Sequence, residues 1–507
     1  MLGWGAATLA GSDCKVFYQR RKKPNIVFIM ADDMGYGDVE CYNPGSKIPT
    51  TNMDRLAKQG VLFTDAHSPS AVCSPTRYGV LTGRYCWRTW LKRGVVGGYT
   101  PPLIEPNRMT LASLLKKQGY RTGCFGKWHI GLGWTRQNGF TPTWKDAEKM
   151  WRGSWQDGDP EKGMNVDFNK PVQGGPVDLG FDEAYYTAAC STIDGPFAYI
   201  QNRYTVGIPD KYIFVDKSKH ADFRPRPGWM AQGFDLEDVD PTFTRKALEF
   251  MEHSQKENHN QPFFVYLSLS SPHAPWLLPD FVKGKSKEGP RGDLVYLADW
   301  CLGEILKALD RLKIADDTLI IMTSDNGPRH GTGEHLSSGS FRGYKSHIWE
   351  GGHRIPFIAR WPGKIQQNTI SGEMICLTDL MATCAAILDT KLPVEAGPDS
   401  FNMLPALLGK KGDVPIREAL VSHSENGTFA IRQGNWKLIL DNKTSGGWVE
   451  PAGERPQPGS PGQLFDLESD PYEKNDLWEE HQDIVEKLTR LLEKYESEGR
   501  SAPVQSR

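Results

Sequence analysis

Two pairs of oxygen-bearing side chains stand directly after apolar runs of the sequence. Asp32 and Asp33 follow the run NIVFIMA, and Asp325 and Asn326 follow TLIIMTS. Carboxylate and amide oxygens are hard ligands that suit Ca²⁺ or Mg²⁺, whereas zinc prefers histidine and cysteine. Either pair alone would be better explained as an ordinary turn. Two pairs at the ends of two apolar runs predict one site for a hard cation.

Lysines and histidines that could handle an anion stand in loops punctuated by glycine or proline. Lys127 and His129 lie in GKWH, His273 in SPHAP and Lys345 in FRGYKSH. Lysine is a point charge that binds oxyanions, and histidine passes protons near neutral pH. A single residue of either type is more often a surface or satisfied core residue. Their position after apolar runs favours His129 and His273 as functional residues.

Cys73 opens the stretch CSPTR, with Arg77 four residues on. The arginine, and a helix predicted to begin near Thr76, would both lower the pKa of the thiol and favour a nucleophilic thiolate. A buried structural cysteine would explain the same residues. The pattern by itself leaves both interpretations open.

The elements that must position these residues alternate between strands and helices. Apolar runs predict buried strands at 25–30, 121–125, 263–267 and 318–322. Helical patterns occupy 51–60, 109–119, 241–253 and 294–312. This alternation predicts an α/β fold with a large, mostly parallel mixed sheet sandwiched by helices. Ligands bind outside the carboxyl ends of strands in such sheets, so the clusters that follow the strands should meet in space.

Changes in composition divide the chain into three parts. Residues 1–22 are expected to be an N-terminal extension or a remnant secretory signal. Residues 23–400 are expected to form the catalytic domain, with 133–235 as an insertion of loops that carries substrate contacts. Residues 401–507 are expected to form a smaller α+β domain with a short antiparallel sheet and a helix. Strand-like runs at 430–440 and 464–467 and a helical pattern at 482–498 support this last part.

The overall composition excludes several classes of protein. The 507 residues carry 60 Lys and Arg against 62 Asp and Glu, so no global basic field favours nucleic acid as a partner. No apolar run of about 18 residues predicts a membrane-spanning helix. The nine cysteines include no C-x-x-C pair, which argues against zinc-ribbon and thioredoxin-type sites.

The motifs, taken in order, resemble those of the type I sulfatases, the formylglycine-dependent, arylsulfatase-A-like enzymes of the alkaline phosphatase superfamily. The resemblance rests on PNIV with the loop DDMGYGD, CSPTR with LTGR, GKWH, SPH, TSDNG, and RGYK with EGG. It covers about residues 23–500 and is weakest across 133–235. Several ordered motifs together are far more specific than any one of them.

The resemblance implies a chemistry for the cysteine. In the family, a separate formylglycine-generating or maturase enzyme oxidises the motif cysteine to Cα-formylglycine, and the hydrated aldehyde is the nucleophile. One hydroxyl attacks sulfur and forms a sulfated hemiacetal. The second then loses its proton, expels sulfate and restores the aldehyde. Cys73 would be the modified residue here, and a thiol or serine would lack the second hydroxyl.

The other roles are carried over by matching position. The ligands of one Ca²⁺ ion would be Asp32, Asp33, Asp325 and Asn326, with Asp325 also able to take the nucleophile's proton. Arg77 and Lys127 would orient the diol, and His129 would be the base for the elimination. His273 would protonate the leaving alcohol, and Lys345 would bind a sulfate oxygen.

The implied substrate is a sulfated carbohydrate, with 6-O-sulfated galactose or N-acetylgalactosamine as the specific prediction. The residues predicted to line the sugar pocket are Arg224, Arg226, Trp229, Arg329, His330, His335 and His347. A true secretory signal would place the protein in the periplasm or outside the cell, in the degradation of sulfated polysaccharides.

Three alternatives remain open at this point. A phosphomonoester or phosphonate hydrolase on the same fold would use two zinc ions with more His and Asp ligands. A non-catalytic, glycan-binding relative would have kept the fold alone, against which the intact motif residues argue. A hydrolase that uses unmodified Cys73 would be sensitive to thiol alkylation and indifferent to chelation.

Overall fold

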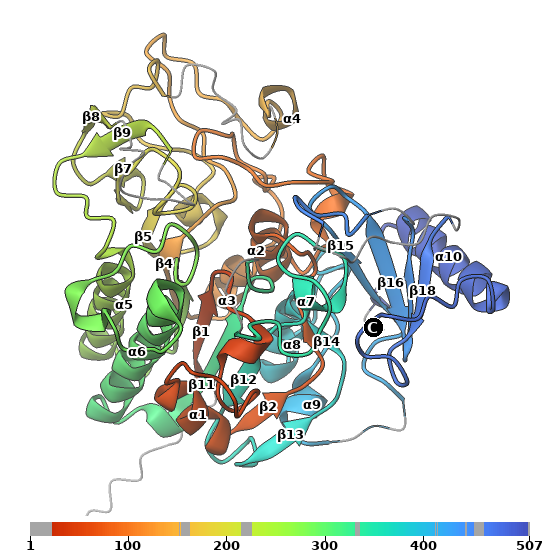
Figure 1. Ribbon diagram of the computed structural model, residues 1–507. Helices are drawn as coiled ribbons and strands as arrows, with labels where there is room; N and C mark the ends of the chain where they lie inside the picture. Colours follow the sequence, from red (N-terminus) through yellow and green to blue (C-terminus); the bar gives the residue numbers. More distant parts are fainter. Residues whose placement is uncertain are drawn as a thin grey trace, which may run out of the picture.

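A ten-stranded mixed sheet is the largest element of the protein (Figure 1). The computed structural model describes residues 23–151, 153, 163–213, 226–329, 335–410, 412, 414–441, 444–450 and 461–504. The strand order is β13-β2-β12-β11-β1-β10-β4-β5-β6-β7. Its parallel centre consists of β11 (Thr318–Ser324), β1 (Asn25–Ala31), β10 (Phe263–Ser268), β4 (Arg121–Lys127) and β5 (Glu183–Thr187). The predicted large, mostly parallel mixed sheet is confirmed.

The outer strands make the sheet mixed. β12 (Phe357–Arg360) runs antiparallel to both β11 and β2 (Val61–Phe63), and β13 (Thr369–Ser371) is parallel to β2. At the other edge, β6 (Ile200–Gln201) and β7 (Tyr204–Thr205) continue from β5 in antiparallel fashion. None of these short strands was predicted, because runs of two to four residues carry too little periodicity.

Helices cover both faces of the sheet because successive side chains of a strand point to opposite sides. All seven residues of β1 are buried. Ile26, Phe28 and Met30 face a core shared with α2 (Cys73–Thr82), α3 (Leu111–Lys117) and α8 (Leu380–Ile387). Val27 and Ile29 face a second core with α1 (Thr51–Lys58), α5 (Val239–Glu257) and α6 (Gly289–Arg311). This burial on both faces explains the continuous apolar run in the sequence.

The C-terminal part folds as the predicted small antiparallel sheet with one helix. Its strands are β15 (Leu420–His423), β16 (Phe429–Gln433), β17 (Trp436–Ile439) and β18 (Gln463–Asp466), in that order, with α10 (Gln482–Ser497) packed on one face. The other face packs against Ile348 and Trp349 of the main body. The single strand predicted at 430–440 is wrong: it is the β16–β17 hairpin. Gly434 (φ 59°) reverses the chain there, in a conformation that glycine adopts at little cost.

The described part of 133–235 holds short elements, one of which, β5, belongs to the main sheet. These are α4 (Ala147–Met150), β5, β6, β7, β8 (Pro209–Ile213) and β9 (Gly228–Ala231). The remaining elements are β3 (Ala66–His67), β14 (Ile375–Cys376), α7 (Glu350–His353) and α9 (Leu404–Leu407). The predicted extension at 1–22 lies outside the described residues.

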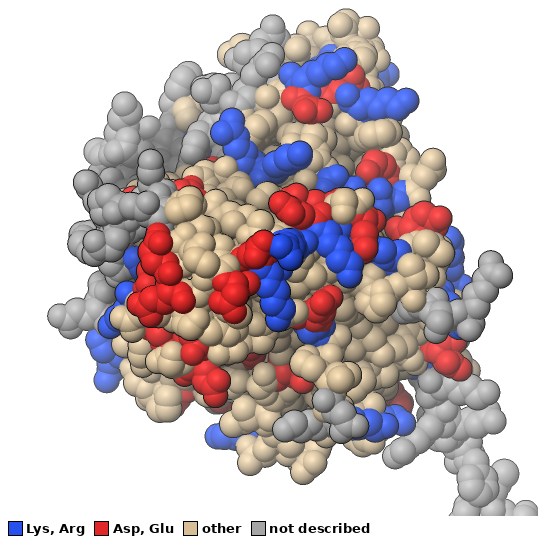
Figure 2. Space-filling model, turned by 90° about the vertical axis from the view of Figure 1, so that its right-hand side faces the viewer, with Lys and Arg blue, Asp and Glu red and all other residues tan. Residues whose placement is uncertain are grey.

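The surface carries both signs of charge. Figure 2 shows basic and acidic side chains lying next to one another over one face of the molecule, in keeping with a formal net charge of −2. Among the described helices, none combines the length and the apolar composition that a membrane crossing requires.

Candidate active site

The two acidic pairs meet at the carboxyl edge of the sheet. β1 and β11 are parallel neighbours with Ala31 paired to Ser324, so the residues that follow them emerge side by side. The backbone N–H of Asp33 donates to Asp325 Oδ1 over 3.2 Å, and Asn326 Nδ2 donates to Asp33 Oδ1 over 2.8 Å. All three side chains are buried, as is that of Asp32. The expectation that these clusters would lie together is confirmed.

Three cationic side chains balance the three carboxylates. The Arg77 guanidinium donates to Asp325 Oδ2 over 2.6 Å, Lys127 pairs with Asp32, and Lys345 Nζ lies 2.6 Å from Asp33 Oδ1. Burial opposes ionisation of Asp32, but Lys127, His273 and Arg77 hold its pKa well below the usual range. For Asp325, burial and the nearby Asp32 charge raise the pKa to about 6. Buried charges persist only when they are paired in this way.

Arg77 is held by more than its carboxylate partner. Its side chain is fully buried, and Nη1 donates to the carbonyl of Lys127 over 3.0 Å and to the hydroxyl of Ser268. Arg77 therefore ties α2 to the ends of β4, β10 and the loop after β11. Ser268 is a site residue that the sequence analysis did not find.

Two oxygens of the acidic cluster fit the requirement of a hard cation. Among the described residues, Asp33 Oδ2 and Asn326 Oδ1 are buried and have no hydrogen-bond partner. An unsatisfied buried oxygen is costly unless it binds something. Three carboxylates and an amide are the donor set that Ca²⁺ and Mg²⁺ prefer. The donor set thus fits one such ion.

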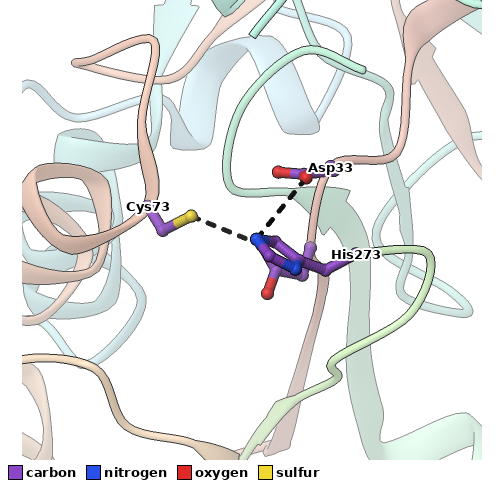
Figure 3. A group of neighbouring side chains, drawn as sticks. Asp33, Cys73 and His273 are labelled. Atoms are coloured by element: carbon purple, nitrogen blue, oxygen red, sulfur yellow. Dashed lines mark hydrogen bonds and ion pairs between the residues drawn. The ribbon is translucent and has the colours of Figure 1, made fainter. Parts of the chain in front are cut away.

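Cys73 faces this cluster from the first residue of α2 (Figure 3). Its thiol donates to Asp32 Oδ1 over 3.5 Å and accepts from Lys345 Nζ over 3.3 Å. Its sulfur, one carboxylate oxygen from each of Asp32 and Asp33, and a His273 ring nitrogen all lie within 4.8 Å of one another.

Two sequence predictions for Cys73 are wrong. The helix begins at Cys73 rather than near Thr76. The pKa of the thiol is raised well above its usual value, mainly because burial and the contact with Cys190 outweigh the charges of Lys127 and Lys345. As an unmodified thiol, Cys73 is therefore a poor source of thiolate.

The two predicted histidines flank the same space. His129 Nδ1 lies 3.8 Å from Cys190 Sγ, and its Nε2 is buried without a partner among the described residues. Burial, opposed by Cys190 and reinforced by Lys127, lowers the pKa of His129 to about 4. His273 hydrogen-bonds through Nδ1 to the Ala274 carbonyl, which leaves Nε2 facing the site, 3.8 Å from Asp33 Oδ2. Although burial opposes it, the Cys190 and Asp33 charges raise the pKa of His273.

A pocket opens over these groups. Its lining residues are Asp33, Cys73, Val95, His129, Cys190, Ile193, Asp194, Arg226, His273, Arg329, Lys345 and Trp448. Of the residues predicted for the sugar pocket, Arg226 and Arg329 line it, and Arg226 is paired with Asp194. Arg224 and His330 lie outside the described residues.

Three predicted pocket residues are placed elsewhere. His335 bonds to Asp38 over 3.0 Å, and His347 Nε2 bonds to the Val449 carbonyl over 2.8 Å. Trp229 packs edge-on against Tyr212. Both histidines are buried and hydrogen-bonded to groups outside the pocket. Their closeness to the site in sequence therefore did not predict their position in space.

Cys190, Asp194 and Trp448 were missed by the sequence analysis. Cys190 follows the end of β5 by three residues, so the strand-end rule that found the other clusters could have found it. Trp448 comes from the connection between β17 and β18, where nothing in the local sequence marks it.

Gly126 sets the path of the backbone that carries Lys127 and His129 at the end of β4. Its replacement tests how closely that backbone approaches Ser268. Its φ is 114°, and a Cβ there would lie 1.8 Å from the backbone oxygen of Ser268. Gly126→Ala should lower the free energy of unfolding by about 3 kcal/mol or more, since backbone would have to move. Gly119→Ala, before the same strand, is the control: its φ is 87° but nothing lies within 4 Å. It should cost only about 1 kcal/mol. Urea unfolding measures both variants. If Gly126→Ala and Gly119→Ala lowered the free energy of unfolding equally, the close approach of Gly126 to the Ser268 backbone would be contradicted.

Comparison with known proteins identifies the family of this chain. A sequence model of the sulfatase family matches residues 24–390. The chain is 36% identical to an N-acetylgalactosamine-6-O-sulfatase of Bacteroides thetaiotaomicron, over 96% of this chain and 97% of that protein. It is 31% identical to human arylsulfatase A, over 90% of this chain and 83% of that protein.

Solved structures share the fold. A Bacteroides thetaiotaomicron protein described under the metabolism of multiple glycosaminoglycans superposes with a TM-score of 0.78 at 33% identity, covering 94% of this chain and 100% of that one. A sulfatase of Pseudoalteromonas sp. superposes with a TM-score of 0.70 at 23% identity, covering 96% and 92%. The chain belongs to the sulfatase family and is a sulfuric ester hydrolase.

Proposed function

We propose that this protein hydrolyses a sulfate ester of a glycan, with 6-O-sulfated galactose or N-acetylgalactosamine as the favoured sugar, and that residue 73 acts as formylglycine beside one Ca²⁺ ion. The observation that carries the proposal is one connected cluster of a thiol, three carboxylates, an amide and three cations, whose members Asp33, Cys73 and Lys345 line a pocket together with two histidines. The N-acetylgalactosamine-6-O-sulfatase relative, matched over nearly its whole length, supports the choice of sugar.

Each group has a role that its position supports. The Sγ of Cys73 stands where an oxygen of the modified residue would lie, and formylglycine there would supply a geminal diol as the nucleophile. Ca²⁺ held by Asp32, Asp33, Asp325 and Asn326 would bind a sulfate oxygen and favour ionisation of that diol. The three cations near residue 73, Arg77, Lys127 and Lys345, would stabilise charge on the transferring group.

The two histidines would carry the proton transfers of the elimination and of the leaving group. His129, whose low pKa keeps it neutral at pH 7, lines the same pocket as Cys73 and would accept the proton of the second hydroxyl at position 73. His273, whose pKa is raised, donates from Nε2 to the oxygen of the leaving alcohol. Asp32 is the carboxylate in contact with Cys73, but Asp325, whose pKa is raised to about 6, is the stronger proton acceptor and keeps the proposed role of taking the nucleophile's proton.

The charge balance favours this function over a two-zinc phosphatase. The charges of three carboxylates and three cations cancel, so one divalent cation would make the cluster positive and suited to an anionic ester. The acidic cluster contributes one histidine, His273, and the neighbouring group with Cys190 and Asp194 contributes one more, His129, where a two-zinc site would need several. The complete set of converging groups argues against a non-catalytic relative.

Replacement of His273 tests the assignment of the leaving-group acid. His273→Ala should lower kcat for a sugar 6-O-sulfate by about 10²–10⁴-fold, the usual worth of general acid catalysis. The loss should be much smaller for 4-nitrophenyl sulfate, because nitrophenolate leaves without a proton. His253→Ala, on the surface of α5, is the matched control and should change neither rate. An equal loss on both substrates would remove His273 from this role.

The maturation and location of the protein complete the proposal. A formylglycine-generating or maturase enzyme would convert Cys73 during biosynthesis. The enzyme would act in the periplasm or outside the cell, on fragments of sulfated polysaccharide. Release of free sulfate from 6-O-sulfated but not 4-O-sulfated N-acetylgalactosamine would support the sugar assignment.

A further inference from the structure

Cys190 is a buried thiol in the pocket that none of the proposed steps uses. It follows β5, in a turn in which the N–H groups of Ile193 and Asp194 both donate to its carbonyl. Its side chain lies against both active-site histidines, 3.8 Å from His129 Nδ1 and 3.7 Å from His273 Nε2. The sulfur of Cys73 also lies within 4.8 Å of a His273 ring nitrogen, so both thiols flank the same imidazole, and each thiol shifts the pKa of the other.

Cys73 and Cys190 form a pair that stands apart from the other described cysteines. Both line the same pocket, with 2% and 5% of their surface exposed, and both are free thiols. Cys41, Cys86, Cys124, Cys301, Cys376 and Cys384 do not line it. The two segments are far apart in sequence but are fixed by α2 and by the parallel strands β4 and β5.

We propose that Cys73 and Cys190 form a disulfide whenever residue 73 is still a cysteine, so that an unconverted chain closes its own sulfate site. The bond would lie at the point where the thiol of Cys73 now contacts Asp32 and Lys345. Conversion of Cys73 removes its sulfur, so the mature enzyme keeps Cys190 as a free thiol. The proposal goes beyond the sulfatase reaction and does not require it.

The chemistry needs only a small oxidant, hydrogen peroxide, able to enter a narrow pocket. Cys190 is the attacking sulfur: although burial opposes it, the Cys73 thiol and the Lys127 charge lower its pKa well below the usual value. Its thiolate attacks one peroxide oxygen, the O–O bond breaks, and hydroxide leaves to give a sulfenic acid. The Cys73 sulfur then attacks the Cys190 sulfur, the S–O bond breaks, and hydroxide leaves with the Cys73 proton as water. Two thiols and one peroxide give one disulfide and two waters.

Peptide mapping tests the bond without any measurement of activity. The full chain is produced without the maturing enzyme, and an intact thiol at position 73 is verified by mass. Native protein is treated with hydrogen peroxide, blocked with N-ethylmaleimide and digested with trypsin without reductant. Cys73 lies in the peptide 59–77 and Cys190 in 163–203, and each peptide holds one cysteine. We expect most of both peptides as one linked species, two hydrogens lighter than their sum and separated by dithiothreitol.

Variants make the outcome specific. Cys190→Ser should abolish the link and leave peptide 59–77 blocked by N-ethylmaleimide. Cys301→Ser, which removes a fully buried thiol of α6, should leave the link intact. Oxidation should also raise the unfolding midpoint of the parent chain and leave that of Cys190→Ser unchanged. The midpoint of unoxidised Cys190→Ser shows in addition whether the substitution itself alters the fold. Recovery of both peptides as separately blocked thiols, or of Cys190 as a sulfinic acid without a link, would overturn the proposal.

Discussion

Cys73→Ala is expected to lower kcat/KM for sulfate ester hydrolysis by about 10⁴-fold or more, the scale seen when a catalytic nucleophile is removed. The variant should still fold, because the side chain is small and lies at a helix start whose backbone alanine can adopt. Initial rates with 4-nitrophenyl sulfate and with a sugar 6-O-sulfate measure the effect. Both substrates should lose activity together, since the nucleophile serves both.

Cys384→Ala is the matched control for that variant. Cys384 is fully buried in α8 and does not line the pocket, so its loss costs packing and not chemistry. It should keep the parent rate within a factor of about two, at a slightly lower unfolding midpoint. Activity within tenfold of the parent in Cys73→Ala would rule out position 73 as the nucleophile.

Removal of calcium is expected to lower turnover by about 10³-fold and to destabilise the fold. The acidic cluster holds Asp33 Oδ2 and Asn326 Oδ1 buried without hydrogen-bond partners among the described residues, and a bound ion would satisfy both. A ligand present at 100 times its Kd stabilises the folded state by about 2.7 kcal/mol. Titration of chelated protein with Ca²⁺ should therefore raise the unfolding midpoint and restore the rate.

Asp33→Ala tests whether the effects of calcium come from an ion bound at the acidic cluster or from calcium acting elsewhere on the protein. This variant should lose both the calcium-dependent shift in midpoint and the turnover. Asp280→Ala removes a carboxylate whose side chain is 94% exposed, and it should keep both responses. If chelated protein retained its rate and midpoint, the cluster would not be a cation site.

The centre of the fold could be predicted from the sequence, because burial on both faces leaves a direct signal. β1 and β11 read as unbroken apolar runs, and the polar residues after them are brought together by the rule that parallel strands end at one edge. Short strands such as β2 and β12 leave no comparable pattern. The β16–β17 hairpin was missed because apolar and polar residues alternate in both strands, and the turn between them is only two residues long. The two strands therefore resemble one continuous strand in the sequence.

The groups that sequence reasoning missed are those whose role depends on distant partners. Trp448 lines the pocket although it comes from the connection between β17 and β18, and its sequence neighbours give no hint of this. The raised pKa of Cys73 follows from complete burial, which outweighs the helix start and the cations that the sequence does reveal. Cys190 was within reach, since it follows a strand that ends at the same edge.

The measurement that tests the central claim most directly is the mass of the tryptic peptide 59–77 from fully active protein. The account predicts that Cys73 has lost its sulfur as H₂S and gained one oxygen, the composition of formylglycine. Hydrazide labelling of the same peptide, absent in Cys73→Ala, would identify the aldehyde. An intact thiol at position 73 in protein with full sulfatase activity would contradict the diol mechanism and make Cys73 itself the nucleophile.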